Sequence, residues 1–145
     1  MGKNAKLNGR CLCGAVRFEA IPLEHEMGVC HCGMCRRWSG GTFMAVECEG
    51  LQIVAGEEPA VYRSSDWGER GFCRKCGSSL FWRGVGGDRA AVSIHAFEDP
   101  DAFAFASEIF VDEKPANYAF ANDTKKMTGA EVIAAFTAKQ DAGNA

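Results

Sequence analysis

Three tight groups hold seven of the eight cysteines of this 145-residue chain, and this clustering constrains the fold more than any other feature of the sequence. The groups read Cys11-Leu-Cys13, Cys30-His-Cys-Gly-Met-Cys35 and Cys73-Arg-Lys-Cys76. The N-terminal stretch MGKNAKLNGRCLCG has no hydrophobic segment of the kind found in a secretory signal, so we expect a cytoplasmic protein with reduced thiols. Short cysteine spacings in a reducing compartment favour metal binding over a disulfide framework.

The composition narrows the classes of partner. Hydrophobic residues make up 47% and charged residues 24% of the chain, as in ordinary globular proteins, and the length suits one domain. The net charge of -3 argues against a general nucleic-acid binder, which usually has a strongly basic face. No apolar run approaches the roughly 18 residues of a membrane helix. We therefore expect neither nucleic acid nor membrane as a partner, and the oligomeric state stays open.

Most of the chain reads as short β-strands. Val16, Phe18 and Ala20 alternate with Arg17 and Glu19, which predicts a half-buried strand over residues 15–21. Further strands are expected over residues 42–48, 51–56, 60–65, 70–73, 79–84, 90–97 and 107–111, and EGLQ is expected to form a turn between the first two of these. Short, closely spaced strands predict a mainly β fold.

The C-terminal segment changes character. Thr128-Gly-Ala-Glu131 has the form of a capping box, with Thr128 as the N-cap residue. Val132, Ile133 and Phe136 follow at helical spacing. We expect one short helix that packs this apolar stripe on the β core, and a dimer contact is the alternative.

Four cysteines are expected to form a closed structural zinc site. Cys73 and Cys76 precede Gly77, which predicts a zinc knuckle whose glycine permits a positive φ. Cys11 and Cys13 would lie on one face of an extended strand and complete the tetrahedron. Such a site joins distant parts of the chain and contributes to folding.

The remaining group is expected to behave differently. Cys30 and Cys32 would share a strand face, and a turn at Gly33-Met34 would return Cys35 toward them. Three protein ligands with one open position are typical of a catalytic zinc site.

Two questions remain open for this group at the level of residues. A distant ligand, with Cys48, His25 and His95 as candidates, would close the site and make it structural. His31 is expected to point away from the metal and to pack or donate a hydrogen bond. Cys48 stands alone in an apolar alternation, so its expected role is that of a small buried side chain.

Four segments together resemble a known family. GRCLCGAVRFE, CHCGMCRRWSGG, GFCRKCGSSLFW and EIFVDEKPANY resemble the glutathione-dependent formaldehyde-activating enzymes, also called the centromere protein V-like family, over roughly residues 8–122. The resemblance implies an Mss4-like fold of coiled β-sheets with two zinc ions per chain. Residues 1–125 would form this zinc-binding β domain, and residues 126–145 a helical extension packed on it. The structural ion would be held by Cys11, Cys13, Cys73 and Cys76, and the catalytic ion by Cys30, Cys32 and Cys35.

The same resemblance implies a carbon–sulfur lyase similar to S-(hydroxymethyl)glutathione synthase. Its substrates would be adducts of glutathione, or of another small thiol, with an aldehyde such as formaldehyde. We expect the thiol to complete the coordination of the second zinc. The alternative is a non-catalytic zinc-binding module that contacts a protein partner and has two structural zinc ions.

Six residues are candidates for substrate contacts. Arg36, Arg37 and Ser39 follow the last cysteine of the second group and could position the carboxylates of a thiol. Trp38, Phe43 and Trp67 could wall an apolar cleft. For each of the six, core packing or a surface position is the alternative.

Overall fold

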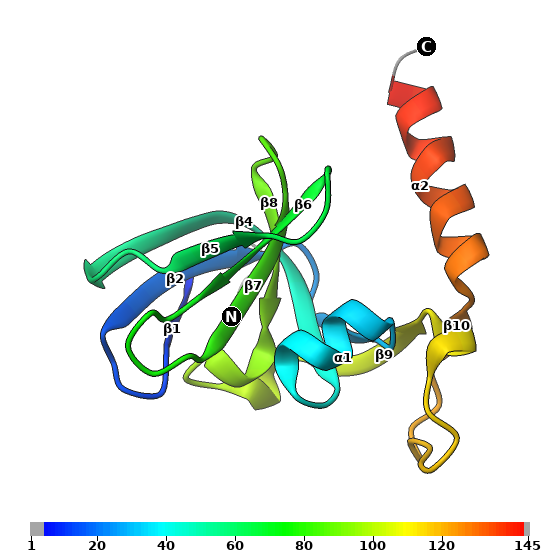
Figure 1. The fold of residues 1–145 in the computed structure, drawn as a ribbon, viewed down its shortest axis with the longest axis horizontal. Coiled ribbons are helices and arrows are strands. Elements are labelled where there is room, and N and C mark those ends of the chain that lie inside the picture. The colour runs from blue at the N-terminus through cyan, green and yellow to red at the C-terminus, as the bar shows by residue number, and fades with distance from the viewer. Residues whose placement is uncertain (1–4, 144–145) are drawn as a thin grey trace. The chain divides into compact units, whose positions relative to one another are not determined.

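The computed structural model describes residues 5–143, the last four of them by their backbone alone. The described chain forms two compact units (Figure 1). Unit 1 contains residues 5–27 and 44–104, and unit 2 contains residues 28–43 and 105–143. The mainly β prediction with a short C-terminal helix is confirmed. The division at residue 125 stays a prediction, and residues 144–145 of the expected extension lie outside the described range.

Unit 1 is built on antiparallel strands in the order β1-β2-β4-β8-β7-β6-β5. The strands are β1 (Leu7–Arg10), β2 (Val16–Pro22), β4 (Phe43–Gly56, whose first residue belongs to unit 2), β5 (Ala60–Arg63), β6 (Gly68–Phe72), β7 (Ser79–Gly84) and β8 (Arg89–Ser93). Two 3-10 turns, η1 (Ile94–Ala96) and η2 (Pro100–Ala102), follow β8. The predicted strand over residues 90–97 therefore ends early, at Ser93.

Strand β4 is continuous where the sequence predicts a turn. Glu19 of β2 pairs with Gln52, but Ile21 pairs with Glu49, so two residues of β4 stand opposite one residue of β2. This β-bulge includes Gly50, whose φ of 62° suits glycine. The predicted turn at EGLQ is wrong because the glycine produces a bulge inside one long strand.

Three phenylalanines pack against one another in the interior of unit 1. The rings of Phe18 and Phe97 meet edge to face at 5.5 Å, and those of Phe97 and Phe103 lie 5.3 Å apart. Each ring is almost wholly buried, which contributes about 1.5–3 kcal/mol of transfer free energy. A Cβ atom at Gly9 would lie 2.3 Å from the Phe18 ring, so β1 approaches the core only because glycine stands there.

Unit 2 combines three strands with both α-helices. Its elements are β3 (Glu26–Cys30), α1 (Gly33–Ser39), β9 (Ala104–Ile109), η3 (Val111–Glu113), β10 (Lys125–Met127) and α2 (Gly129–Gly143), and the first residues of β3 and β9 belong to unit 1. Strand β9 lies between β3 and β10, and the β9–β10 pair is parallel.

Helix α1 replaces the turn predicted at Gly33-Met34. Cys32 is its N-cap residue, with extended backbone at φ -62° and ψ 154°. Gly40 ends the helix in the left-handed conformation at φ 75°, and its N–H donates to the carbonyl of Arg36 over 2.9 Å. A glycine directly after a helical segment is a common C-terminal signal, and the prediction overlooked it.

The backbone turn at Phe110, directly after β9, places two carboxylates at the starts of the two helices of unit 2. Phe110 has a left-handed backbone at φ 55°, which is unusual for a residue with a side chain. The chain then turns through η3, where Glu113 accepts the N–H of Gly33 over 3.1 Å. Asp112 accepts the N–H of Gly129 over 2.8 Å. Each carboxylate satisfies a free N–H at the start of a helix.

The C-terminal helix begins as predicted but does not bury its apolar stripe. The N–H of Glu131 donates to the hydroxyl of Thr128 and the N–H of Thr128 donates to the carboxylate of Glu131, both over 3.2 Å, which completes the capping box. Ile133 and Phe136 are 61% and 57% exposed, so the expected burial of the stripe is wrong. The three apolar residues span only the first two turns, and the rest of the helix is small or polar. Within the described residues, neither helix has the length and apolar character of a membrane span.

Candidate metal centres

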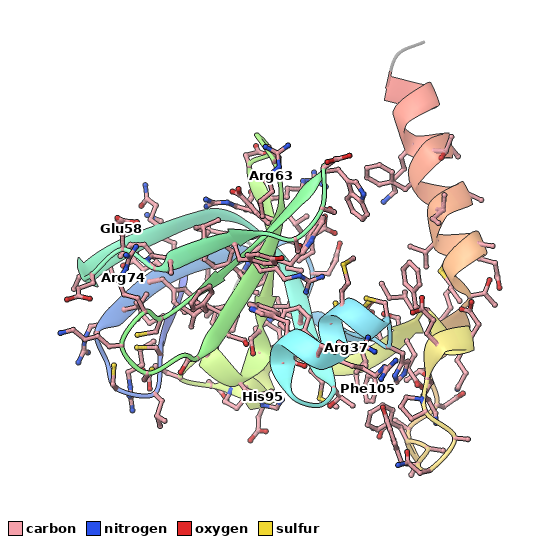
Figure 2. The ribbon with its side chains drawn as sticks, in the orientation of Figure 1. Arg37, Glu58, Arg63, Arg74, His95 and Phe105 are labelled. Atoms are coloured by element: carbon pink, nitrogen blue, oxygen red, sulfur yellow. The ribbon has the colours of Figure 1, made fainter. Side chains whose placement is uncertain are left out.

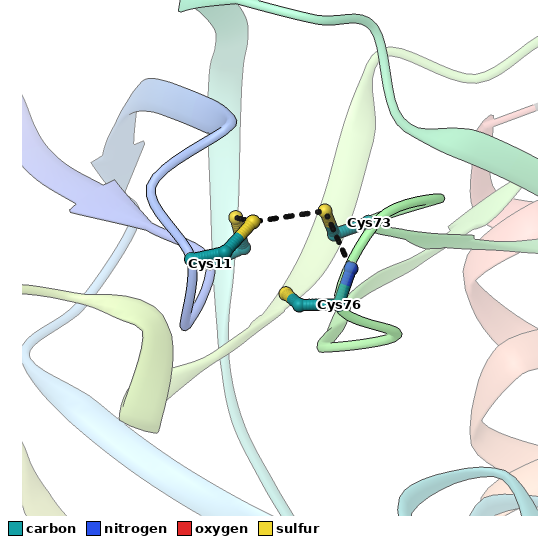
Figure 3. A group of neighbouring side chains, drawn as sticks. Cys11, Cys73 and Cys76 are labelled. Carbon is teal, nitrogen blue, oxygen red and sulfur yellow. Dashed lines mark hydrogen bonds between the residues drawn. The ribbon is translucent and has the colours of Figure 1, made fainter.

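The first cysteine group comprises Cys11, Cys13, Cys73 and Cys76, all in unit 1. Figure 3 labels three of them, Cys11, Cys73 and Cys76. Their four Sγ atoms lie within 4.8 Å of one another. The Sγ atoms of Cys11 and Cys13 are 3.7 Å apart, and those of Cys13 and Cys73 are 3.8 Å apart. A tetrahedral zinc with Zn–S bonds of about 2.3 Å places its sulfurs about 3.8 Å apart. The sulfur positions therefore fit one tetrahedral zinc ion.

Two tight turns bring these sulfurs together. The N–H of Gly14 donates to the carbonyl of Cys11 over 3.2 Å, and the N–H of Gly77 donates to that of Cys73 over 2.8 Å. Gly14 and Gly77 have φ values of 81° and 79°, which favour glycine. The knuckle at Cys73 agrees with the prediction. The extended strand predicted for the other pair is wrong, because β1 ends at Arg10 and the chain turns at once.

Hydrogen bonds to sulfur favour the thiolate forms that bind zinc. The N–H of Val16 donates to Cys11 Sγ over 3.3 Å and that of Lys75 to Cys73 Sγ over 3.4 Å. Burial alone would raise the pKa of Cys11, but the Val16 N–H and neighbouring thiols outweigh it and lower that pKa. The Ser78 hydroxyl, 3.1 Å away, is the main cause that lowers the pKa of Cys76 to about 5.

Cations of the knuckle connect it to the preceding loop. Arg74 donates to the carbonyls of Glu58 and Pro59 over 3.3 and 3.5 Å. Figure 2 labels Arg74 and Glu58, which lie beside each other. Lys75 forms an exposed ion pair with Glu57 at 3.2 Å. These contacts fasten the knuckle to the segment before β5.

The second cysteine group comprises Cys30, Cys32 and Cys35, all in unit 2. Cys30 ends β3, Cys32 caps α1 and Cys35 lies in its first turn. Their Sγ atoms also lie within 4.8 Å of one another. The N–H of Cys35 donates to Cys32 Sγ over 3.4 Å, so the helix start itself holds one sulfur. The seven cysteines thus assemble in the two groups that the sequence predicts.

Because the three sulfurs lie close together, the pKa values of Cys32 and Cys30 shift in opposite directions. Hydrogen bonds from the thiols of Cys30 and Cys35 lower the pKa of Cys32 to about 2. Hydrogen bonding to Cys32 and Cys35, together with burial, raises the pKa of Cys30. Three sulfurs this close ionise together only beside a cation, which is the chemistry of a metal site.

The residues suggested as a fourth ligand do not join the second group. Within the described chain, no further His, Cys, Asp or Glu ligand atom belongs to the cluster. The three candidates, His25, Cys48 and His95, all belong to unit 1. Cys48 is fully buried and burial raises its pKa to about 12, as expected of a packing residue.

His31 points into a buried polar network. Its side chain is fully buried, and Nε2 lies 2.9 Å from Oε1 of Glu108, which is itself 2% exposed. Burial would raise the pKa of Glu108, but hydrogen bonds from Thr124 and His31 and the charge of Lys126 lower it. The prediction for His31 is confirmed, whereas its carboxylate partner was not anticipated. Glu108 is the acidic residue of an apolar strand segment, SEIFV, and that anomaly was the available signal.

The polar substrate candidates differ in their freedom. Arg36 donates through Nε to the carbonyl of His31 over 3.0 Å. Ser39 donates to the carbonyl of Cys35 over 2.7 Å, so its hydroxyl serves the helix. Arg37 is exposed, and its Nη1 donates to the carbonyl of Gly33 over 3.3 Å.

The aromatic candidates divide between the units. Trp38 and Phe43 belong to unit 2 and their rings meet edge to face at 5.1 Å. Trp67 belongs to unit 1, where it is 61% exposed and packs on Trp82 at 5.6 Å. The structure therefore brings five of the six candidates into the unit that contains the second group.

Comparison with known proteins points to one family. The model of the family "Glutathione-dependent formaldehyde-activating enzyme" matches residues 6–113. A Schizosaccharomyces pombe protein named "Uncharacterized lyase" is 35% identical over 127 residues, which cover 86% of this chain and 93% of that protein. A Halomonas elongata protein named "Putative glutathione-dependent formaldehyde-activating enzyme" is 34% identical over 85 residues, covering 52% of this chain and 54% of that protein.

One solved structure has a fold similar to that of this chain. The crystal structure of a Rhodobacter sphaeroides protein is similar with a TM-score of 0.55 and 26% identity, covering 63% of this chain and 88% of that one. The expected Mss4-like fold is that of the matched family. From the family match and the two cysteine groups together, the chain belongs to the glutathione-dependent formaldehyde-activating enzyme family.

Proposed function

We propose that the protein is a zinc-dependent carbon–sulfur lyase that acts on adducts of glutathione, or another small thiol, with an aldehyde such as formaldehyde. The observation that carries the proposal is the second group, in which three cysteine sulfurs gather without a fourth His, Cys, Asp or Glu ligand among the described residues. The family match supports glutathione and formaldehyde as the substrates to test first.

The proposal assigns one zinc ion to each group. The four sulfurs of the first group would hold a structural ion, and Cys30, Cys32 and Cys35 would hold a catalytic one. A zinc ion in a site of this kind acts as a Lewis acid and lowers the pKa of a bound thiol. The chain contributes the thiolates, their fixed spacing and the buried surroundings of Cys35.

The overall reaction is a reversible addition. In the forward direction the thiol sulfur forms a bond to the aldehyde carbon, and the thiol proton ends on the former carbonyl oxygen. In the lyase direction the carbon–sulfur bond breaks and thiol and aldehyde are released.

The substrate candidates take different roles in this proposal. Glutathione has two carboxylates, and the exposed guanidinium of Arg37 is suited to bind one of them. The edge-to-face pair of Trp38 and Phe43 would provide an apolar wall. Arg36, Ser39 and Trp67 remain candidates, with the first two committed to backbone carbonyls. A cytoplasmic location, which keeps such thiols reduced, completes the proposal.

The test is exchange-resolved NMR of ¹³C-formaldehyde mixed with glutathione, with the zinc content of the protein measured in parallel. Wild type with two zinc ions should accelerate formation and breakdown of S-hydroxymethylglutathione above the uncatalysed rate. Cys35→Ser, with one zinc ion left, should not. A wild type that binds two zinc ions but leaves the rate unchanged for formaldehyde and other small aldehydes would favour a non-catalytic zinc module.

A further inference from the structure

His31, which lies between Cys30 and Cys32 in the chain, is held by hydrogen bonds at its N–H, its carbonyl and its ring. The N–H of His31 donates to the carbonyl of Ile109 over 3.0 Å, and its own carbonyl accepts from Arg36 over 3.0 Å. Its Nε2 lies 2.9 Å from the carboxylate of Glu108. Since Cys30 and Cys32 are its direct neighbours in the chain, any shift of His31 would move two of the three sulfurs.

The carboxylate that holds His31 is itself held from a different part of the chain. Thr124 donates its hydroxyl to Oε2 of Glu108, and the ammonium of Lys126 lies 3.7 Å from the same oxygen. A carboxylate buried without partners would cost several kcal/mol, and these contacts offset that cost. The strand pair β9–β10 places Lys126 opposite Glu108 in register.

Aromatic rings shield the pair from water. The ring of Phe120 lies 6.0 Å from the ring of His31, and the hydroxyl of Tyr118 lies 3.5 Å from its Nδ1. Lys114 holds the segment that contains Tyr118 in place. Its ammonium donates to the carbonyls of Pro115 and Tyr118 and lies 4.4 Å from the centroid of the Tyr118 ring. The carboxylate accepts from Nε2–H, which leaves Nδ1 facing the tyrosine hydroxyl. Both ring nitrogens of His31 are therefore directed to residues other than the cysteines.

A purely packing role does not require this arrangement. Replacing a buried polar pair by apolar side chains of similar size is often neutral or stabilising, so burial alone gives no reason for a carboxylate here. The carboxylate contacts the one residue whose backbone joins Cys30 to Cys32. That placement connects the pair to the geometry of the sulfurs.

We propose that Glu108 and His31 are positioning residues that hold the second cysteine group in its ligand geometry and thereby set its affinity for metal. The inference rests on the metal-binding part of the proposed function and is independent of the reaction. It assigns control of the second group to Glu108, which stands 73 or more residues from each of the three cysteines in sequence. The first cysteine group, held by its own turns, is independent of this network.

The test compares Glu108→Ala and Glu108→Gln with wild type, and uses Glu69→Gln as the matched control. Glu69 is a half-buried carboxylate of unit 1 that pairs with Arg83 at 2.6 Å. Zinc affinity of each group is measured by competition with a chelator, and the visible absorption of Co²⁺-loaded protein reports the ligand geometry.

Glu108→Ala should weaken zinc binding by the second group about 10- to 100-fold and alter its Co²⁺ spectrum, with the first group unchanged. Glu108→Gln should recover much of both, because its amide oxygen still accepts from His31. Glu69→Gln should leave both groups as in wild type. If Glu108→Ala does not fold, Thr124→Val removes one hydrogen bond from the carboxylate, and should weaken the second group several-fold.

Two outcomes would overturn the inference alone and leave the proposed function standing. A folded Glu108→Ala with wild-type affinity and spectrum would leave the pair as packing only. Equal weakening of both groups would indicate a general loss of stability. A wild type whose second group binds neither Zn²⁺ nor Co²⁺ would overturn both, because the inference and the proposed function depend on the same metal site.

Discussion

The two cysteine groups are supported in opposite ways. The first has four sulfurs on two tight turns, and the hydrogen bonds that residues outside the group form with its sulfurs come from within five positions of one of its cysteines. The second has three sulfurs at a strand–helix junction, and its backbone is held by Glu113, Ile109 and, through His31, Glu108. A group with four ligands needs little help from elsewhere, whereas a group with three depends on distant residues for its precision.

The largest difference should appear when one cysteine is removed from each group. Cys76→Ser should lose the first zinc ion and cooperative unfolding, because a structural zinc contributes on the order of 10 kcal/mol to folding. Cys35→Ser should lose only the second zinc ion and stay folded. Zinc content and thermal melts of both variants, beside wild type, measure this contrast. Equal loss of stability in the two variants would make both groups structural.

Metal removal should separate the groups in time. A group with three protein ligands should release zinc to a chelator before a group with four, since fewer bonds hold the ion. Under limiting chelator, about one zinc ion per chain should leave together with the activity, and the fold should remain. A colorimetric zinc assay followed by circular dichroism tests the order, and re-addition of zinc should restore the activity. Activity that persists after one zinc ion per chain has left would contradict the assignment of the catalytic ion to the second group.

The strands that lead into the two groups should also differ in how well they tolerate a glycine-to-alanine substitution. A Cβ atom at Gly71 in β6 would lie 2.2 Å from the buried Phe81 ring, so Gly71→Ala should cost about 1–3 kcal/mol of overpacking. A Cβ atom at Gly28 in β3 would lie 2.5 Å from the hydroxyl of Ser107, which can rotate, so Gly28→Ala should cost less. Urea unfolding of the zinc-loaded proteins measures both changes. Gly41→Ala, with no atom within 4 Å of the added Cβ, is the control.

The smallest effect is expected away from both groups. Thr128→Ala removes the capping box of α2 and should destabilise that helix by about 1 kcal/mol. Far-ultraviolet circular dichroism should show reduced helicity, while both zinc affinities stay unchanged. Thr137→Ala, an exposed change within the same helix, should leave helicity equal or slightly higher. A change in the zinc affinity of the second group on loss of the cap would connect α2 to the site.

Local patterns predict the features that depend on near neighbours in the chain. The knuckle at Cys73 and the capping box at Thr128 each follow from spacing over four residues. The partition of seven cysteines into two groups also follows, because the first pair and the knuckle pair complete each other's tetrahedron.

Features that depend on tertiary contacts escaped prediction. Whether Gly50 ends a strand or bulges within it depends on the pairing of β4 with β2, which no local pattern contains. The exposed position of Phe136 depends on what lies against the helix rather than on its own periodicity. Glu108 acquires its importance only through a contact with a histidine 77 positions away.

The left-handed backbone at Phe110 has a consequence for how this segment can change in length. It sets the direction in which η3 leaves β9, so that Asp112 meets the start of α2 and Glu113 the start of α1. One residue inserted or deleted between Phe110 and Glu113 would redirect the carboxylates away from both helices, including the one that contains Cys35. Most turns on a protein surface accept such length changes, whereas this one should be fixed in length as strictly as an internal strand.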